Sequence, residues 1–165
     1  MRPIRRRRGE AIGAATIAAL AIAVPMAGAA ELSREQYSAR VEPICKTNTE
    51  ANRRIFKGAK AEVKADELKQ AAGHFTRAAA ALERTISQLK AVPRPAADEA
   101  RLAKWIGYLE TESSLLGGIG RALAQEDKAK AQLYSVRLNR NSNLANNTVL
   151  AFAFEYCRID PARFG

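Results

Sequence analysis

Apolar side chains recur at alternating steps of four and three along most of this 165-residue chain, and this spacing restricts the fold to packed helices. The clearest stripe comprises Leu68, Ala72, Phe75, Ala79, Leu82, Ile86 and Leu89. Asp66 precedes it as a candidate N-cap. Pro93 and Pro95 then end this helix and start the next, because proline fits a first helical turn but not a helix interior.

A second stripe follows the prolines and predicts another long helix. It comprises Leu102, Trp105, Ile106, Leu109, Ser113, Leu116, Ile119, Gly120 and Leu123. Gly117, Gly118 and Gly120 lie within this helix, where each costs about 1 kcal/mol relative to alanine. We therefore expect a close contact with a neighbouring helix, or a bend, at these glycines.

The last helix has an unusually polar stripe. Glu126 and Asp127 are the predicted N-terminus of this helix. The same spacing then continues through Ala129, Leu133, Val136, Arg140, Asn143, Leu144, Asn147, Leu150, Phe154 and Cys157. We expect this helix to extend to Cys157, with these side chains facing the other helices.

The first helix begins at Ser33 and Gln36, which have the spacing of a capping box. Its stripe comprises Tyr37, Val41, Ile44, Asn48, Ala51 and Ile55. Good helix formers follow Gly58, so we expect the helix to resume there and to turn near Asp66.

Four helical stripes in one chain predict an all-α fold, an antiparallel up-down-up-down four-helix bundle over residues 31–165. A chain of about 135 residues is long enough for one hydrophobic core and leaves little room for a second domain. The bundle is expected to follow an N-terminal signal peptide over residues 1–30.

Residues 1–30 have the layout of that signal peptide. Arginines at positions 2 and 5–8 precede an apolar run from Ala11 to Ala30, in which Pro25 is followed by small residues. We expect cleavage near Ala30 and a location that is secreted or extracytoplasmic, in the cell envelope. The alternatives are a membrane tether formed by an uncleaved signal anchor, because the apolar run approaches the length that spans a bilayer, and twin-arginine export.

The net charge of +10 belongs partly to this segment. Five of the 27 basic residues and one of the 17 acidic residues lie in it, which leaves a net charge of +6 for the remainder. An exported protein of such moderate charge is not expected to bind nucleic acid.

The two cysteines, Cys45 and Cys157, are expected to form a disulfide, because an exported protein folds in an oxidising compartment. The bond would join the first helix to the end of the last. If these helices are antiparallel, Ile55 then lies near the level of Asn147.

These features resemble a group of small, uncharacterised secreted proteins of actinobacteria. The resemblance rests on a cysteine early in the first helix, the segment Leu89-Lys90-Ala91-Val92-Pro93, Ala122-Leu123 followed by Asp127, and an aromatic-rich end at Cys157. It implies a helical bundle with one cysteine pair and export, and it implies no activity.

The sequence contains no grouping of side chains that predicts an enzyme, metal or cofactor site. His74, the one histidine, is expected on the outer face of its helix as a solvated side chain and not as a metal ligand. Glu110 and Glu112 lie two positions apart and so point to different helix faces, which disfavours paired-carboxylate catalysis. Cys-x-x-Cys and phosphate-loop motifs are absent.

Two groups of residues are candidate binding sites. Polar stripe residues either line a small pocket or fix helix register: Asn48, Ser113, Asn143 and Asn147. A basic stretch either meets cell-wall polymer or an anionic lipid surface, or is a solvated helix face: Arg53, Arg54, Lys57, Lys60 and Lys64.

These observations favour a non-enzymatic extracytoplasmic binding or interaction module. The alternative is a small-ligand carrier that binds its ligand between the helices near Trp105 and Phe75. An enzyme with an unrecognised site comes third. A pocket beside Trp105 would favour the carrier, whereas a filled core with a basic face would favour interaction with a macromolecule.

Export predicts that the protein outside the cytoplasm begins at Ala30 or Glu31, because small residues follow Pro25 at the expected cleavage point. Intact-mass measurement or N-terminal sequencing of the exported protein checks this. Exported protein that still begins at Met1 would contradict cleavage and favour the signal anchor.

Overall fold

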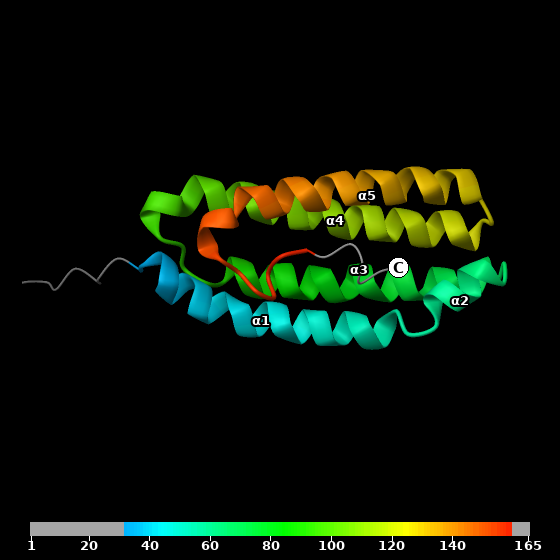
Figure 1. Cartoon of the computed structure of the whole chain (residues 1–165), viewed down its shortest axis with the longest axis horizontal. Helices are drawn as coiled ribbons and strands as arrows, with labels where there is room; N and C mark the ends of the chain where they lie inside the picture. The colour runs from blue at the N-terminus through cyan, green and yellow to red at the C-terminus, as the bar shows by residue number, and fades with distance from the viewer. Residues whose placement is uncertain (1–31, 160–165) are drawn as a thin grey trace, which may run out of the picture. The chain divides into compact units, whose positions relative to one another are not determined.

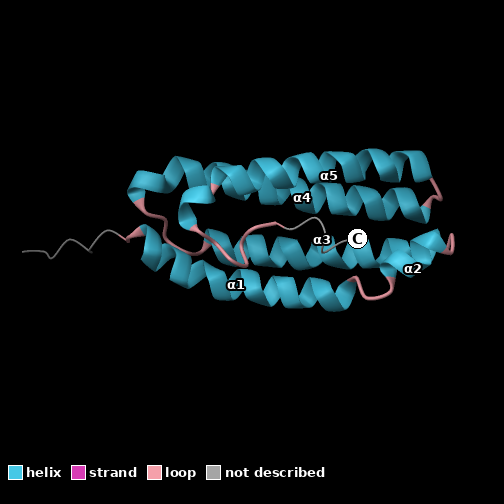
Figure 2. Cartoon of the chain, in the orientation of Figure 1, coloured by secondary structure: helices cyan, strands magenta, loops and turns pink. Residues whose placement is uncertain are grey.

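The computed structural model describes residues 32–159, and within this range the chain is helical without strands. The elements are α1 (Arg34–Ile55), α2 (Ala59–Lys64), α3 (Leu68–Lys90), the 3-10 helix η1 (Ala96–Asp98), α4 (Glu99–Ala124), α5 (Lys128–Thr148) and the 3-10 helix η2 (Leu150–Phe152). Four long helices, α1, α3, α4 and α5, lie side by side (Figures 1 and 2). The expected signal peptide, residues 1–30, lies outside the described residues.

The start of α1 and the joint between α1 and α2 are confirmed. The Ser33 hydroxyl accepts a hydrogen bond from the Gln36 N–H at 3.2 Å, and the Gln36 side chain accepts one from the Ser33 N–H at 2.9 Å. Gly58 has a φ of 93°, a conformation that favours glycine, and α2 begins directly after it. The chain then turns at Asp66, whose φ is 64°, and Glu67 takes the N-cap position expected of Asp66.

The helices pack in a row and not in a closed ring. Helix α3 packs against α1 and α2 on one side and against α4 on the other, and α5 packs against α4. Helices α1 and α5, the first and last long helices, barely contact each other. The side of the bundle between them is therefore free to receive another part of the chain.

The C-terminal segment, defined here as residues 153–159, occupies that side. The expectation that the last helix reaches Cys157 is wrong, because α5 ends at Thr148 and the chain reverses through η2 and Ala153, whose φ is 51°. Cys157 bonds to Cys45 from this segment and not from a helix. The expectation that Ile55 lies at the level of Asn147 assumed one continuous helix from Asn147 to Cys157. Because α5 ends at Thr148, this expectation no longer follows.

Aromatic packing and hydrogen bonds hold the C-terminal segment in place. The ring of Phe154 lies 5.2 Å from that of Phe152 and 5.5 Å from that of Trp105. The Glu42 carboxylate accepts hydrogen bonds at 2.9 Å from the backbone N–H groups of residues 155 and 156. Asn146 bonds both the N–H and the carbonyl of Ile159, at 2.8 and 2.6 Å. The segment is thus fixed to α1 and to α5.

The stripe expected to face inward on the last helix faces solvent instead. Leu133, Val136 and Leu144 are 48%, 55% and 43% exposed, and Arg140 is exposed as well. The buried side chains of α5 are Ala131, Leu138, Asn141, Ser142 and Ala145. Small and polar residues on this face let α5 lie close to α4, so the larger apolar residues are left on the outside.

The glycines of α4 make the close helix contacts expected of them. A Cβ on Gly120 would lie 2.8 Å from the Thr76 hydroxyl oxygen and 3.1 Å from the Ala72 carbonyl oxygen of α3. A Cβ on Gly118 would lie 3.0 Å from the ring of Tyr134 on α5. Glycine at these two positions thus sets how closely both neighbours approach α4.

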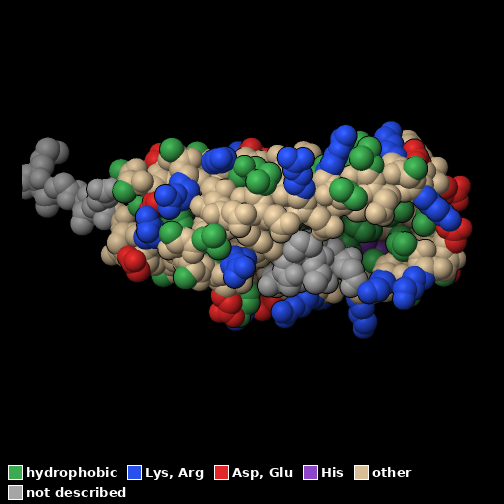
Figure 3. Space-filling view, turned by 45° about the horizontal axis from the view of Figure 1, so that its top comes forward, with side chains coloured by type: hydrophobic (Ala, Val, Ile, Leu, Met, Phe, Trp, Pro, Cys, Tyr) green, Lys and Arg blue, Asp and Glu red, His purple; other side chains and the backbone are tan. Residues whose placement is uncertain are grey.

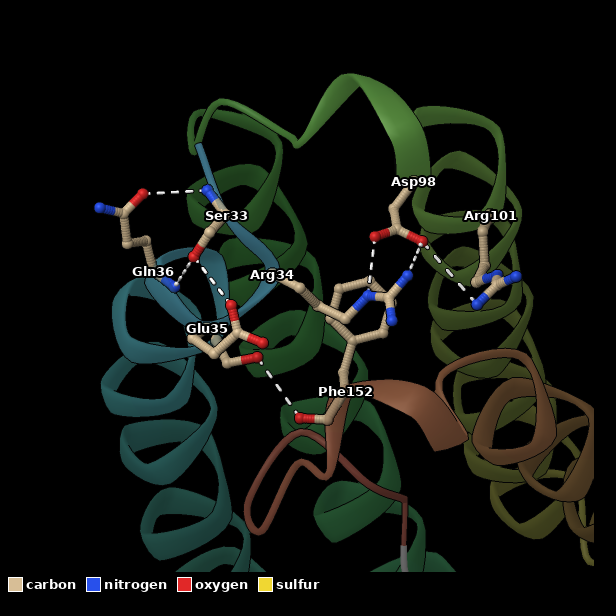
Figure 4. Close-up of polar contacts among 8 residues, drawn as sticks. Ser33, Arg34, Glu35, Gln36, Asp98, Arg101 and Phe152 are labelled. Carbon is tan, nitrogen blue, oxygen red and sulfur yellow. Dashed lines mark hydrogen bonds and ion pairs between the residues drawn. The ribbon is translucent and has the colours of Figure 1, made fainter. Parts of the chain in front are cut away.

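A partly buried ion pair joins the first turn of α1 to the start of α4 (Figure 4). Arg34 donates two hydrogen bonds to the Asp98 carboxylate, at 2.8 and 2.9 Å, and Asp98 is 4% exposed. The same guanidinium lies 5.2 Å from the centre of the Phe152 ring, and the Ser38 hydroxyl donates to the Phe152 carbonyl at 3.4 Å. This end of the bundle therefore ties α1, α4 and the start of the chain reversal together.

Within residues 32–159, the structure contains no helix that could span a bilayer.

Reduction of the disulfide should lower the melting temperature of the protein and leave most of the helical circular-dichroism signal. The bond closes a loop with a sequence separation of 112 residues, for which the chain-entropy treatment gives about 5 kcal/mol of stabilisation. The helices themselves form most of their contacts without it. Alkylation of both thiols in the native, unreduced protein would contradict the bond.

Candidate functional site

A cavity lies where α1 and α5 fail to meet. Helices α1, α3 and α4 form three of its walls, and residues 156–159 of the C-terminal segment form the fourth. Its volume is about 50 Å³, and it opens to solvent on one side. A buried water needs roughly 10–15 Å³ of such space, so the cavity has room for about four water-sized groups.

Four buried polar atoms of the residues that line this cavity have no hydrogen-bond partner within the described chain. They are Asn48 Oδ1, Asn52 Oδ1, Trp105 Nε1 and Glu112 Oε2. Leaving such an atom unpaired costs about 1–3 kcal/mol, and buried polar groups are normally bonded to protein, water or ligand. Four of them around one space mark it as a place for a polar guest.

Glu112 is the deepest of these groups. It is 3% exposed, and burial raises the pKa of its carboxyl to about 8. Among the described residues of the cavity wall, Arg158 is the other charged side chain; it is exposed and forms no ion pair with Glu112. At pH 7 the carboxyl is therefore mostly protonated and can donate as well as accept a hydrogen bond.

Apart from Thr49, Thr85 and Arg158, the rest of the described wall is mostly apolar. Trp105 is fully buried, and the centre of its ring lies 5.5 Å from that of Phe154 in the C-terminal segment. Leucines from two helices complete this surface: Leu82, Leu89, Leu109 and Leu116. A small-molecule site usually combines a small number of polar groups with a largely apolar wall.

The inner face of α1 changes from apolar to polar side chains along the helix, and this change forms part of the site. The buried face of α1 begins with Tyr37 and Val41, and after Cys45 it presents Asn48 and Asn52 to the cavity. On α4, Trp105 and Glu112 lie seven positions apart and so share a face. The polar atoms thus come from two helices that α3 holds apart.

The four polar residues proposed from the sequence do not come together. Asn48 lines the cavity, whereas Asn143 and Asn147 are exposed on α5. Ser113 is buried between α4 and α3, where its hydroxyl donates to the Ala79 carbonyl at 3.1 Å. The side chains that join Asn48 at the cavity are Asn52, Trp105 and Glu112. Asn52 and Glu112 were not predicted as site residues from the sequence.

His74 is buried, at 8% exposed, so the expectation of a solvated side chain is wrong. Its Nδ1 contacts the Ile55 carbonyl oxygen and its Nε2 lies 3.1 Å from Glu62 Oε1. His74 is buried because α4 covers one side of α3 and the joint between α1 and α2 packs against another side, where His74 lies. His74 is therefore a structural link between α3 and this joint.

The basic stretch lies on the outside of the molecule. All five of its residues, Arg53, Arg54, Lys57, Lys60 and Lys64, are exposed on α1, α2 and the turn between them. In residues 32–159 no cluster of three or more histidine, cysteine or acidic side chains could hold a metal ion.

Stability should fall as the pH rises from about 4.5 to 8, because the unfolded chain loses the Glu112 proton at its ordinary pKa of 4.5 and the folded protein retains it up to about 8. The free energy of unfolding should fall by about 1.4 kcal/mol per pH unit through this residue. Urea unfolding at a series of pH values measures it.

Glu112→Gln should flatten this dependence, and Glu110→Gln, on the exposed side of the same helix, should leave it unchanged. Equal pH slopes in the wild type and the Glu112→Gln variant would contradict the buried neutral carboxyl.

Comparisons of the chain with protein family models, curated proteins and solved structures give no match. A function for this chain therefore has to be inferred from its own side chains.

Proposed function

We propose that this protein is a non-enzymatic extracytoplasmic binding module that carries a small ligand in the cavity between α1, α3, α4 and the C-terminal segment. The observation that carries the proposal is the set of four unpaired buried polar atoms around one cavity beside Trp105. A pocket beside Trp105 favours a carrier over an interaction module with a filled core.

The proposal includes export and topology. Residues 1–30 act as the signal peptide, and the mature chain forms an up-down-up-down bundle whose long helices alternate in direction. Short connections support this arrangement, because α3 and α4 are joined through residues 91–98 and α4 and α5 through residues 125–127. The disulfide is consistent with an oxidising compartment.

The side chains favour a small amine as the ligand. Three oxygen acceptors belong to residues that line the cavity, namely Asn48, Asn52 and Glu112, and the ring of Trp105 is part of the same wall. An ammonium group is a donor of three hydrogen bonds, and both carboxylate and indole ring attract its charge. The volume of about 50 Å³ admits this end group, while any larger remainder extends through the open side.

Binding of an ammonium group requires Glu112 to lose its proton, since the neutral acid offers no charge to the ligand. Amine affinity should therefore increase as the pH rises towards 8, where the folded carboxyl ionises. Among residues 32–159, Glu112 is the one acid that lines the cavity, so no paired carboxylate stands beside it for acid–base chemistry, which supports a binding role over catalysis.

Native mass spectrometry of the protein isolated from its own host tests the proposal. We expect a bound small molecule that is retained in the wild type and lost in Asn52→Leu and Glu112→Leu. Asn143→Leu, an exposed asparagine on α5, is the matched control and should retain it. Thermal shift with a panel of small primary amines then tests the ligand class directly. No bound mass together with no shift by any amine would overturn the proposal.

A further inference from the structure

The outer face of α5 carries most of the exposed large apolar side chains of the described chain. Five such residues occur in residues 32–159, namely Val63, Leu133, Val136, Leu144 and Leu150. Four of these belong to α5 or follow it directly, with exposed fractions from 43% to 62%. Residues 133, 136, 140 and 144 are spaced by three or four, so they form one continuous stripe along the helix.

The same face is positively charged. Lys130, Arg137 and Arg140 are exposed on it, and within residues 32–159 none of the three forms an ion pair. The chain contains no acidic residue from Lys128 to Phe154. Figure 3 shows Lys and Arg side chains and hydrophobic side chains following one another along this side of the molecule.

Further cations lie where the stripe ends. Arg101 and Lys104 of α4 border a shallow surface hollow together with Asn147 and Leu150. Leu150, the most exposed of the apolar residues at 62%, is thus flanked by basic side chains of a second helix. The combination of exposed leucine with lysine and arginine extends beyond α5 itself.

The shape of this face restricts its partner. Helix α5 packs on α4 and barely contacts α1, so its outer side is a convex ridge at the edge of the bundle. An amphipathic helix binds in a groove, which a ridge does not supply. A second copy of this chain would bring Lys130, Arg137 and Arg140 against like charges, which opposes pairing through this face. A flat, deformable, anionic surface fits both the shape and the charge.

We propose that the α5 outer face, defined as Lys130, Leu133, Val136, Arg137, Arg140 and Leu144, docks on an anionic lipid surface. The helix lies parallel to the surface. Leu133, Val136 and Leu144 enter the boundary between headgroups and acyl chains, and the cations contact lipid phosphates. None of these six residues lines the cavity, so the inference is independent of the proposed ligand.

Vesicle co-sedimentation of the exported, disulfide-bonded protein tests this. The probes are vesicles of phosphatidylcholine containing phosphatidylglycerol, and vesicles of phosphatidylcholine alone. We expect binding to the first, weak binding to the second, and a decrease with added salt.

Two triple variants separate the apolar and the charged contribution. Leu133→Ser/Val136→Ser/Leu144→Ser keeps the charge, and Lys130→Gln/Arg137→Gln/Arg140→Gln keeps the apolar stripe. Each should weaken binding to anionic vesicles by about tenfold or more, because both groups contact the membrane. All six side chains are exposed, and circular dichroism checks that the fold is retained.

The matched control is Arg53→Gln/Arg54→Gln/Lys57→Gln, which removes three exposed cations from the basic stretch of α1. Its binding should stay within about twofold of the wild type. An equal loss in the control would show attraction by net charge and overturn the assignment to α5. Unchanged binding in both α5 variants would overturn it as well. A dimer in analytical ultracentrifugation that the serine variant dissociates would identify a second copy as the occupant instead.

Discussion

The bond between Cys45 and Cys157 constrains the part of the chain on which the rest of this structure depends. Helices α1 and α5 do not close the bundle, and the C-terminal segment takes the place of that contact. The segment is not helical and so has no repeating face with which to pack. It is held instead at single points, by the disulfide, by the Glu42 carboxylate and by Asn146. Because the C-terminal segment is attached at only a few residues, a cavity remains between it and the helices. Two helices packed along their whole length would not leave such a cavity.

Much of the fold could be predicted because local rules decide it. The capping box at Ser33, the joint at Gly58 and the close contacts at Gly120 each follow from a residue type with a strong conformational or steric preference. The face of α5 could not be predicted in this way. Periodicity locates the most apolar stripe, but α5 packs through small and polar residues such as Ala145 and Ser142 and leaves Leu133 and Val136 outside. Which face of α5 is buried depends on how closely its backbone approaches that of α4. The hydrophobicity of the sequence does not predict that distance between the two helices.

Only part of the candidate site could be predicted from the sequence. Asn48 was recognised as a polar residue on an apolar stripe, and it lines the cavity. Glu112 was weighed only as a partner for Glu110, although steps of four, three and four from Trp105 through Leu109 lead to Glu112 and Leu116. That count places an acid on the buried face of α4, which is where the structure has it. The closing wall could not be foreseen, because it depends on the end of α5 and on a reversal at Ala153.

The cavity and the disulfide are therefore linked energetically as well as geometrically. Unpaired groups at Asn48, Asn52, Trp105 and Glu112 weaken the folded state, and a leucine or alanine at each position would relieve that cost if stability were the sole requirement. The disulfide acts in the opposite direction by restricting the unfolded chain, and it does so at the edge of the same cavity. A guest that bonds these groups would remove the cost that they impose, and it would add its binding free energy to the stability of the folded state. Under the proposed function, these polar groups cost stability in the protein alone and add to it when the ligand binds, whereas a purely structural core gains nothing from leaving them unpaired.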